Sequence, residues 1–203
     1  MKSKISVIIQ SRTGSTRLPN KVLAKIEDKP MICHVIDRIK KVPLVEQIIL
    51  ATSANPNDNV LLKIAEDNMI MSYAGKKFDV LDRFFHAAQI YNADPIIRIT
   101  SDCPLIDFKL VNEMIDFFTK HNFDYVSNTI KSTYPDGLDT EIFSFKTLKT
   151  AFNNAKLPSE REHVTPYIKK NPNSFKIFNY KNKQDLSNFR LSVDEETDLI
   201  LVK

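Results

Sequence analysis

The chain has 203 residues, with 29 lysines and arginines against 25 aspartates and glutamates, which gives a formal net charge of +4. This length is sufficient for one domain with a full hydrophobic core, so neither disulfides nor a metal are needed for stability. The positive excess is too small for the dense basic face of a nucleic-acid-binding protein. Composition therefore excludes a nucleic-acid role and favours small anions as partners.

Two cysteines, Cys33 and Cys103, lie far apart and lack the spacing of a metal site. Such cysteines are typical of a reducing compartment, and they predict no disulfide framework. The apolar run near the N-terminus is too short for a signal peptide, and no later stretch is long enough to span a membrane. We therefore expect a soluble, cytoplasmic protein without membrane partners.

Strand-like apolar runs alternate with helical periodicity along the first 128 residues. The expected strands cover residues 5–10, 47–52, 69–73 and 95–100, and the expected helices cover residues 31–39, 57–68, 79–91 and 110–118. Strands that are apolar on both faces and are separated by helices pair in parallel, with helices on both faces of the sheet. The first half thus predicts a doubly wound α/β sheet.

The pattern loosens after a further expected strand at residues 124–128. A short extended run at 140–145 is followed by an expected helix at 147–155, and the polar segment 159–170 precedes extended runs at 174–180 and 188–194. We interpret this part as a small α+β region that completes the sheet and adds a lid or an acceptor face. No repeat or linker separates the two parts, so we expect one shared core.

The loop directly behind the first strand, residues 11–21, combines three cations with small residues: Arg12, Gly14, Ser15, Thr16, Arg17 and Lys21. In open α/β sheets, ligands bind where the carboxyl ends of strands meet, and such a loop can wrap a polyphosphate with backbone amides and cationic side chains. The loop matches neither the Walker sequence nor the dinucleotide fingerprint. A solvated basic loop is the alternative, but its position after a buried strand favours phosphate binding.

Two aspartates follow other extended segments. Asp102 leaves the strand at 95–100, and Asp194 ends the extended run at 188–194, which we expect to be a strand. Magnesium prefers one or two carboxylates together with phosphate oxygens and water, so this pair suits one metal site. A turn or helix cap is the competing interpretation for Asp102, and Asp107 is better explained as the N-cap of the next helix.

The loop SRTGSTRLPNK resembles the R-x-x-S-x-R-x-P-x-K signature of the sugar-nucleotide cytidylyltransferases, which include the CMP-sialate and CMP-Kdo synthetases. The strings KPMICHVIDR, DVLDRF, RITSDCPLID, YPDGLDTE and EREHVTPYI resemble the SpsF-type branch, associated with spore-coat polysaccharide. The resemblance runs from Ile5 to about Leu199. Departures from the sialate and Kdo enzymes are Gln10-Ser11 in place of Pro-Ala and Ser53 in place of an aspartate, which leaves the acceptor undetermined.

This resemblance implies a Rossmann-like nucleotidyltransferase domain over residues 1–203, with a nucleotide-binding half (1–128) and an acceptor-side half (129–203). The implied activity is transfer of CMP from CTP to a hydroxyl of a sugar or sugar acid, with Mg²⁺ as cofactor and pyrophosphate as second product, for surface polysaccharide or glycan synthesis. Members of the family are often dimers, and the sequence leaves the oligomeric state open.

The resemblance also assigns roles to individual residues of this chain. Arg12, Ser15, Arg17 and Lys21 match triphosphate-binding positions, with Lys21 next to the α-phosphate. Asp102 matches the metal-binding aspartate and Asp194 its C-terminal partner; Lys21, Arg12 and Asp102 would thus carry catalysis. Arg83, in DVLDRF, is similar to a residue of the nucleotide pocket, although an ordinary arginine on a helix surface is an equal alternative.

Polar residues in two later loops are candidates for binding the acceptor: Asp136, Asp139, Glu141, Arg161 and His163. Arg161 suits the carboxylate of an acidic sugar, and His163 or Asp139 suits the orientation or deprotonation of the attacking hydroxyl. Structural roles compete equally here, because Ser159 and Glu162 have the spacing of a capping box and Asp-Gly is common in turns.

Two other function classes compete with nucleotidyl transfer. A glycosyltransferase of related fold would use an Asp-x-Asp metal motif, but Ser101-Asp102-Cys103 offers a single aspartate. A non-catalytic nucleotide-binding module would bind CTP without turnover, which the presence of Lys21 and both aspartates disfavours.

Overall fold

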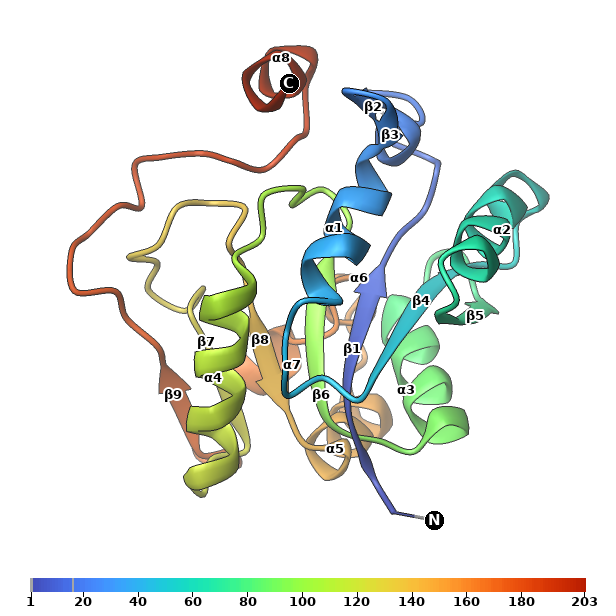
Figure 1. Ribbon diagram of the computed structural model, residues 1–203. Coiled ribbons are helices and arrows are strands. Elements are labelled where there is room, and N and C mark those ends of the chain that lie inside the picture. The colour runs from blue at the N-terminus through green and yellow to red at the C-terminus, as the bar shows by residue number, and fades with distance from the viewer. Residues whose placement is uncertain (1, 16) are drawn as a thin grey trace.

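The computed structural model describes residues 2–15 and 17–203. A seven-stranded sheet in the order β5-β4-β1-β6-β8-β7-β9 forms its centre (Figure 1). The strands are β1 (Lys4–Gln10), β4 (Gln47–Ser53), β5 (Met71–Gly75), β6 (Ala93–Thr100), β7 (Tyr125–Ser127), β8 (Glu141–Phe143) and β9 (Ile177–Asn179). β8 runs antiparallel to β6 and β7, whereas β1, β4, β5 and β6 pair in parallel. The predicted doubly wound, mostly parallel α/β fold is confirmed.

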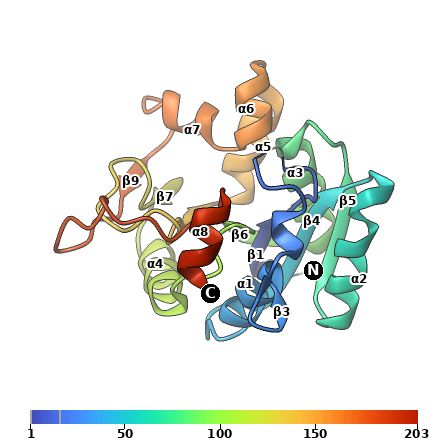
Figure 2. The ribbon, with the colours of Figure 1, turned by 90° about the horizontal axis from the view of Figure 1, so that it is seen from above.

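Helices cover both faces of the sheet because its strands are apolar on both sides. Val7 and Ile9 of β1 pack into one core cluster and Ile8 into the other, as the alternation along a strand requires. The first face carries α1 (Met31–Ile39), α2 (Asn59–Asp67) and α4 (Phe108–Lys120). The second carries α3 (Val80–Tyr91), α5 (Phe145–Asn154), α6 (Pro158–His163) and α7 (Pro166–Lys170) (Figures 1 and 2).

Smaller elements lie beyond the carboxyl ends of the parallel strands (Figure 1). They include η1 (Lys21–Leu23), a hairpin of β2 (Lys25–Ile26) and β3 (Lys29–Pro30), and α8 (Glu196–Val202); η2 (Pro56–Asp58) leads into α2. In the part of the chain that is described, no helix has the length and apolar character needed to cross a membrane.

The chain order reverses at β1, which lies between β4 and β6. The segments that follow β1 and β6 therefore leave the sheet side by side, and Ser101 N donates a hydrogen bond to Gln10 O. Such a reversal opens a crevice at the carboxyl ends of the strands, where α/β proteins bind ligands. The topology thus brings the cationic loop and the segment that contains Asp102 to one place.

Several predicted elements differ from the observed ones at their ends, and one expected strand is absent. The third strand covers Met71–Gly75 instead of residues 69–73. The expected strand at 188–194 is absent, and the segment makes only an isolated bridge between Arg190 and Asp136. Backbone hydrogen bonds from Leu191 N to Asp136 O and from Val193 N to Asp102 O hold it instead. Asp194 is therefore positioned by contacts between loops, which a strand pattern does not reveal.

Gly137 offers a test of that loop contact, because its φ is +101° and a Cβ placed on it would lie 2.5 Å from Ser192 N and 2.6 Å from Leu191 C. We expect Gly137→Ala to lower the free energy of unfolding by on the order of 2 kcal/mol, measured by urea denaturation. Gly14→Ala is the matched control, because no described atom other than those of its chain neighbours lies within 4 Å of its added Cβ. Equal stability of the two variants would contradict this role for Gly137.

Candidate active site

The ammonium group of Lys21 joins three segments that are distant in the sequence. Its Nζ donates hydrogen bonds to Asp102 Oδ2 at 3.0 Å, Asp194 Oδ1 at 2.8 Å and Val193 O at 3.0 Å. Burial lowers the pKa of Lys21, but the charges and hydrogen bonds of the two aspartates outweigh this effect and raise it. Lys21 is therefore a fixed positive charge at the centre of the crevice.

Asp194 receives two further cations. Arg17 and Arg190 each place an Nη2 atom 3.0 Å from Asp194 Oδ2. Burial raises the pKa of Asp194, but Lys21, Arg17 and Arg190 lower it below its ordinary value. The carboxylate of Asp194 is thus ionised, because the three neighbouring cations favour its charged form.

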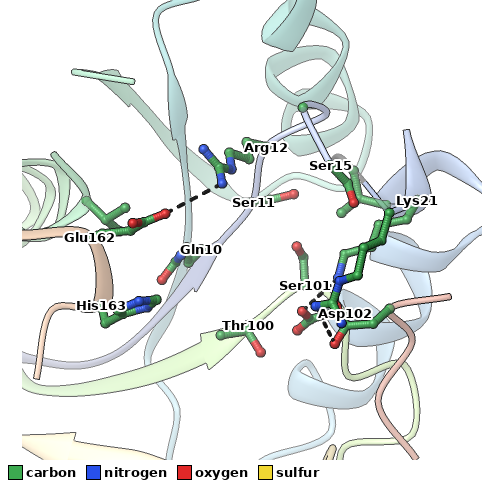
Figure 3. Close-up of a pocket in the computed structure, with 15 residues that line it drawn as sticks. Gln10, Ser11, Arg12, Ser15, Lys21, Thr100, Ser101, Asp102, Glu162 and His163 are labelled. Atoms are coloured by element: carbon green, nitrogen blue, oxygen red, sulfur yellow. Dashed lines mark hydrogen bonds and ion pairs between the residues drawn. The ribbon is translucent and has the colours of Figure 1, made fainter. Parts of the chain in front are cut away.

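A cavity of about 320 Å³ opens beside Lys21. Ser15, Arg17, Lys21, Asp102 and Asp194 line one end, with Gly14 nearby, and Gln10, Arg12, Glu162 and His163 line the other. Thr100 and Ser101 lie between the two ends (Figure 3). At the second end Arg12 Nη2 lies 3.7 Å from Glu162 Oε1. One end of the cavity is therefore lined mostly by charged side chains, and the other by both charged and neutral polar side chains.

Asp58, at the N-terminal side of α2, fixes the start of the cationic loop. Thr13 donates to Asp58 Oδ1 from its backbone N at 2.8 Å and from Oγ1 at 2.6 Å, and Ser53 donates to Oδ2. Burial raises the pKa of Asp58, but these hydrogen bonds lower it overall. Thr16, which we predicted to help form the anion-binding turn, lies outside the described residues.

Arg83 does not line this cavity. It is fully buried in α3, and its Nη1 donates to the carbonyl oxygens of Lys76 and Lys77. Its Nε and Nη2 have no hydrogen-bond partner among the described residues. Burial, followed by repulsion from Arg12, lowers the pKa of Arg83. The alternative interpretation, an arginine exposed on a helix surface, is therefore wrong.

Of the residues predicted to bind the acceptor, His163 lines the cavity, whereas Glu141 and Arg161 have other partners. Arg161 donates to both oxygens of Asp79, from Nε at 3.0 Å and from Nη2 at 2.6 Å, which ties α6 to the start of α3. Glu141, the first residue of β8, is buried and forms ion pairs with Arg98 and Lys169. Neither side chain reaches the cavity.

Asp136 and Asp139 also lie outside the cavity lining. Ser192 Oγ donates to Asp136 Oδ2 at 2.7 Å, so Asp136 helps to hold the segment that leads to Asp194. Asp139 is half-buried. Burial raises its pKa to about 6, and the neighbouring charges of Asp136 and Glu141 contribute to the same effect.

Several cavity residues were not predicted from the sequence as part of the site. Closeness in sequence was an available signal for four of them. Gln10 ends the strand before Arg12, Thr100 and Ser101 lie just before Asp102, and Glu162 precedes His163. Arg190 and Asp58 gave no such signal. The contact of Asp58 with Thr13 joins segments 45 residues apart, whereas Arg190 lies four residues before Asp194 in an irregular segment whose conformation the sequence pattern did not predict.

A mostly parallel sheet with a cation-rich cavity where its strand order reverses is typical of a Rossmann-like nucleotide-binding protein. A model of the cytidylyltransferase family matches residues 6–200. The chain therefore belongs to the cytidylyltransferase family and is a nucleotidyltransferase enzyme.

Two relatives cover most of the sequence. The chain is 41% identical over 202 residues to the uncharacterized protein MJ1063 of Methanocaldococcus jannaschii, covering 98% of this chain and 81% of the relative. It is 27% identical over 206 residues to the spore coat polysaccharide biosynthesis protein SpsF of Bacillus subtilis, covering 98% and 85%. These similarities support an SpsF-type relationship.

Two solved structures share the fold. A cytidylyltransferase from Leptospira borgpetersenii serovar Hardjo-bovis superposes with a TM-score of 0.93 at 35% identity, covering 97% of this chain and 84% of that one. A CMP:2-keto-3-deoxy-manno-octonic acid synthetase complexed with CTP superposes with a TM-score of 0.75 at 18% identity, covering 98% and 97%. At that identity the second match shows the fold alone.

Asp139 makes the stability of the protein depend on pH. The pKa of Asp139 is about 6 in the folded state, compared with an ordinary value of 3.8. Protonated Asp139 therefore makes its full contribution to the stability of the fold below pH 3.8. This contribution is lost as the pH rises through 6. At pH 7.5 we expect Asp139→Asn to be more stable than the wild type by on the order of 1 kcal/mol, because partial exposure reduces the roughly 3 kcal/mol that two pKa units represent.

Urea denaturation at pH 4 and pH 7.5 measures this difference, which should nearly vanish at pH 4. Asp28→Asn, which changes an exposed carboxylate in the turn between β2 and β3, is the control. An Asp139→Asn variant that is no more stable than the wild type at pH 7.5 would contradict the raised pKa.

Proposed function

We propose that the protein transfers CMP from CTP to a hydroxyl group of a sugar or sugar acid and releases pyrophosphate. The observation that carries this proposal is the contact of Lys21 with both Asp102 and Asp194, beside a loop that contributes Arg12 and Arg17 to the same cavity. Two similar proteins support the choice of nucleotide and substrate class. One is a CMP:2-keto-3-deoxy-manno-octonic acid synthetase complexed with CTP, and the other is a spore coat polysaccharide biosynthesis protein.

In the proposed reaction an acceptor hydroxyl oxygen forms a bond to the α-phosphorus of CTP while the bond to the β-phosphate oxygen breaks. Negative charge spreads over the phosphate oxygens, so catalysis consists mostly of positioning and charge neutralisation. Lys21 stabilises charge at the α-phosphate, and Arg12, Arg17, Ser15 and the backbone around Gly14 hold the triphosphate. We assign the role of accepting the hydroxyl proton to His163, because it lines the cavity and Asp139 does not.

The donor chemistry suits a divalent cation. Asp102 and Asp194 each accept a hydrogen bond from Lys21 through one oxygen, so the two carboxylates lie close enough together to share one cation. No cluster of three or more histidine, cysteine, aspartate or glutamate side chains suited to a metal was found among the described residues. Two carboxylates with substrate oxygens match the preference of magnesium. When bound, Mg²⁺ would neutralise charge on the phosphates; we propose that Asp102 and Asp194 hold it.

The buried guanidinium of Arg83 is the remaining predicted nucleotide contact. Two of its nitrogens have no hydrogen-bond partner within the described part of the chain, and such groups are costly to bury without a hydrogen bond. We propose that Arg83 supports the nucleotide pocket from within α3, three residues after Val80, which lines the cavity.

Removal of a charge at the centre of the site should abolish most turnover. We expect Lys21→Ala and Asp102→Asn each to lower kcat by ~10²–10³, the usual effect of losing one preorganised charge-stabilising group. Pyrophosphate release from CTP and Mg²⁺ with a panel of sugars and sugar acids measures this, and circular dichroism checks the fold. Lys25→Ala, an exposed lysine of β2, is the matched control. Wild-type rates in either site variant would refute the assignment.

The same assay separates the competing activities. A glycosyltransferase would consume nucleotide-diphosphate sugars and produce no pyrophosphate from CTP. A non-catalytic nucleotide-binding module would bind CTP in calorimetry but release no pyrophosphate with any acceptor.

The proposed metal ligands can be tested by binding instead of turnover. Calorimetric titration of MnCl₂ into CTP-loaded protein should show at least about 10-fold weaker metal binding in Asp102→Asn and in Asp194→Asn than in the wild type. Asp28→Asn, far from the cavity lining, should bind as the wild type does. Unchanged affinity in both site variants would show that the metal is held elsewhere.

A further inference from the structure

Strand register lines up three polar side chains on the face of the sheet that α6 covers. Arg98 of β6 is directly paired with Glu141 of β8 and with Ile8 of β1, and Gln10 lies two residues further along β1. Residues two apart on a strand share a face, so Glu141, Arg98 and Gln10 project from the same side of the sheet. They form a row that leads from the buried interior to the cavity.

Glu141 is the fixed end of this row. It accepts hydrogen bonds from Tyr125 and from Thr165 Oγ1, and Lys169 Nζ lies 2.9 Å away. Burial raises the pKa of Glu141, but Arg98, Lys169 and the hydrogen bonds lower it to about 2. Glu141 is therefore an ionised and immobile partner for the guanidinium of Arg98.

Arg98 in turn orients the amide of Gln10. Its Nη1 donates to Glu141 Oε2, and its Nη2 donates to Gln10 Oε1 at 3.1 Å. A guanidinium can only donate hydrogen bonds, so the amide oxygen of Gln10 must face Arg98. The Nε2 atom of Gln10 has no protein partner among the described residues, and the Gln10 side chain lines the cavity.

The cavity end that contains Gln10 is built to be rigid. Glu162 and His163 lie on α6, which the bidentate pair of Arg161 and Asp79 ties to α3. Figure 3 shows Gln10 next to His163, with Lys21 and Asp102 at the other end of the cavity. Under the proposed function the charged end holds the triphosphate. Because His163 is the proposed acceptor of the hydroxyl proton, the attacking hydroxyl lies at its end of the cavity, next to Gln10.

We propose that Gln10 is a specificity-determining residue, whose Nε2 donates a hydrogen bond to a carboxylate, carbonyl or hydroxyl oxygen of the acceptor. Arg98 is its positioning residue. This inference rests on the proposed nucleotidyl transfer and deepens it, because it requires an acceptor with an oxygen that accepts a hydrogen bond close to the reacting hydroxyl.

Two variants test the donor. Gln10→Glu replaces the amide nitrogen with an oxygen and keeps a partner for Arg98, and Gln10→Met removes the polar atoms without adding charge. We expect both to raise the KM for the acceptor about 10-fold or more, the size of effect for a lost or reversed hydrogen bond. Gln10→Met should leave the KM for CTP within about 2-fold, because Arg17 and Lys21, which bind the phosphates under the proposed function, line the other end of the cavity.

Gln89→Glu, an exposed position on α3, makes the same chemical change away from the cavity and should alter neither constant. An unchanged acceptor KM in Gln10→Met, or a change confined to the KM for CTP, would overturn the inference while leaving the proposed function intact. Absence of pyrophosphate from the wild type with every acceptor would contradict the proposed function, and this inference with it.

Discussion

The hydrogen bonds of the Lys21 ammonium to Asp102 and Asp194 are the interaction on which the site depends. They connect the segment after β1, the segment after β6 and a distant C-terminal loop across the crevice of the sheet. Each carboxylate would repel the other without a cation between them, since like charges at close range oppose joint ionisation. The ammonium therefore stabilises the arrangement of the three segments beside the place where, under the proposed function, Mg²⁺ and the phosphates of CTP would bind.

The rest of the site is organised by buried polar contacts that reach it indirectly. Asp58 holds the cationic loop through Thr13, and Arg98 connects the buried carboxylate of Glu141 to the cavity at Gln10. A buried charge is costly unless it is paired and hydrogen-bonded, so both acids carry several partners. Several of these partners, among them Ser53, Tyr125 and Lys169, lie on strands or helices, so regular secondary structure helps to hold the cavity in place.

The sequence predicted the charged end of the cavity better than its polar end. Arg17, Lys21 and Asp102 follow buried strands, and the carboxyl ends of parallel strands meet at one edge of a sheet, so their approach to one another follows from order along the chain. Arg161 and Glu141 looked similar as polar loop residues, yet one pairs with Asp79 and the other is buried. A polar residue near a predicted site has no intrinsic preference for ligand over protein partners, which explains these differences.

The sequence by itself determined the alternation of strands and helices, the family and the cation-rich loop, because apolar periodicity and short-range motifs are local properties. Only the tertiary structure decided that Asp194 reaches Lys21 from a loop without strand pairing, that Arg83 is fully buried, and that Gln10 presents its amide nitrogen to the cavity. Each of these depends on a partner 40 or more residues away or on the depth of the side chain in the packed interior. The identity of a distant partner and the depth of a side chain are set by how the segments pack, and local sequence patterns do not reveal either.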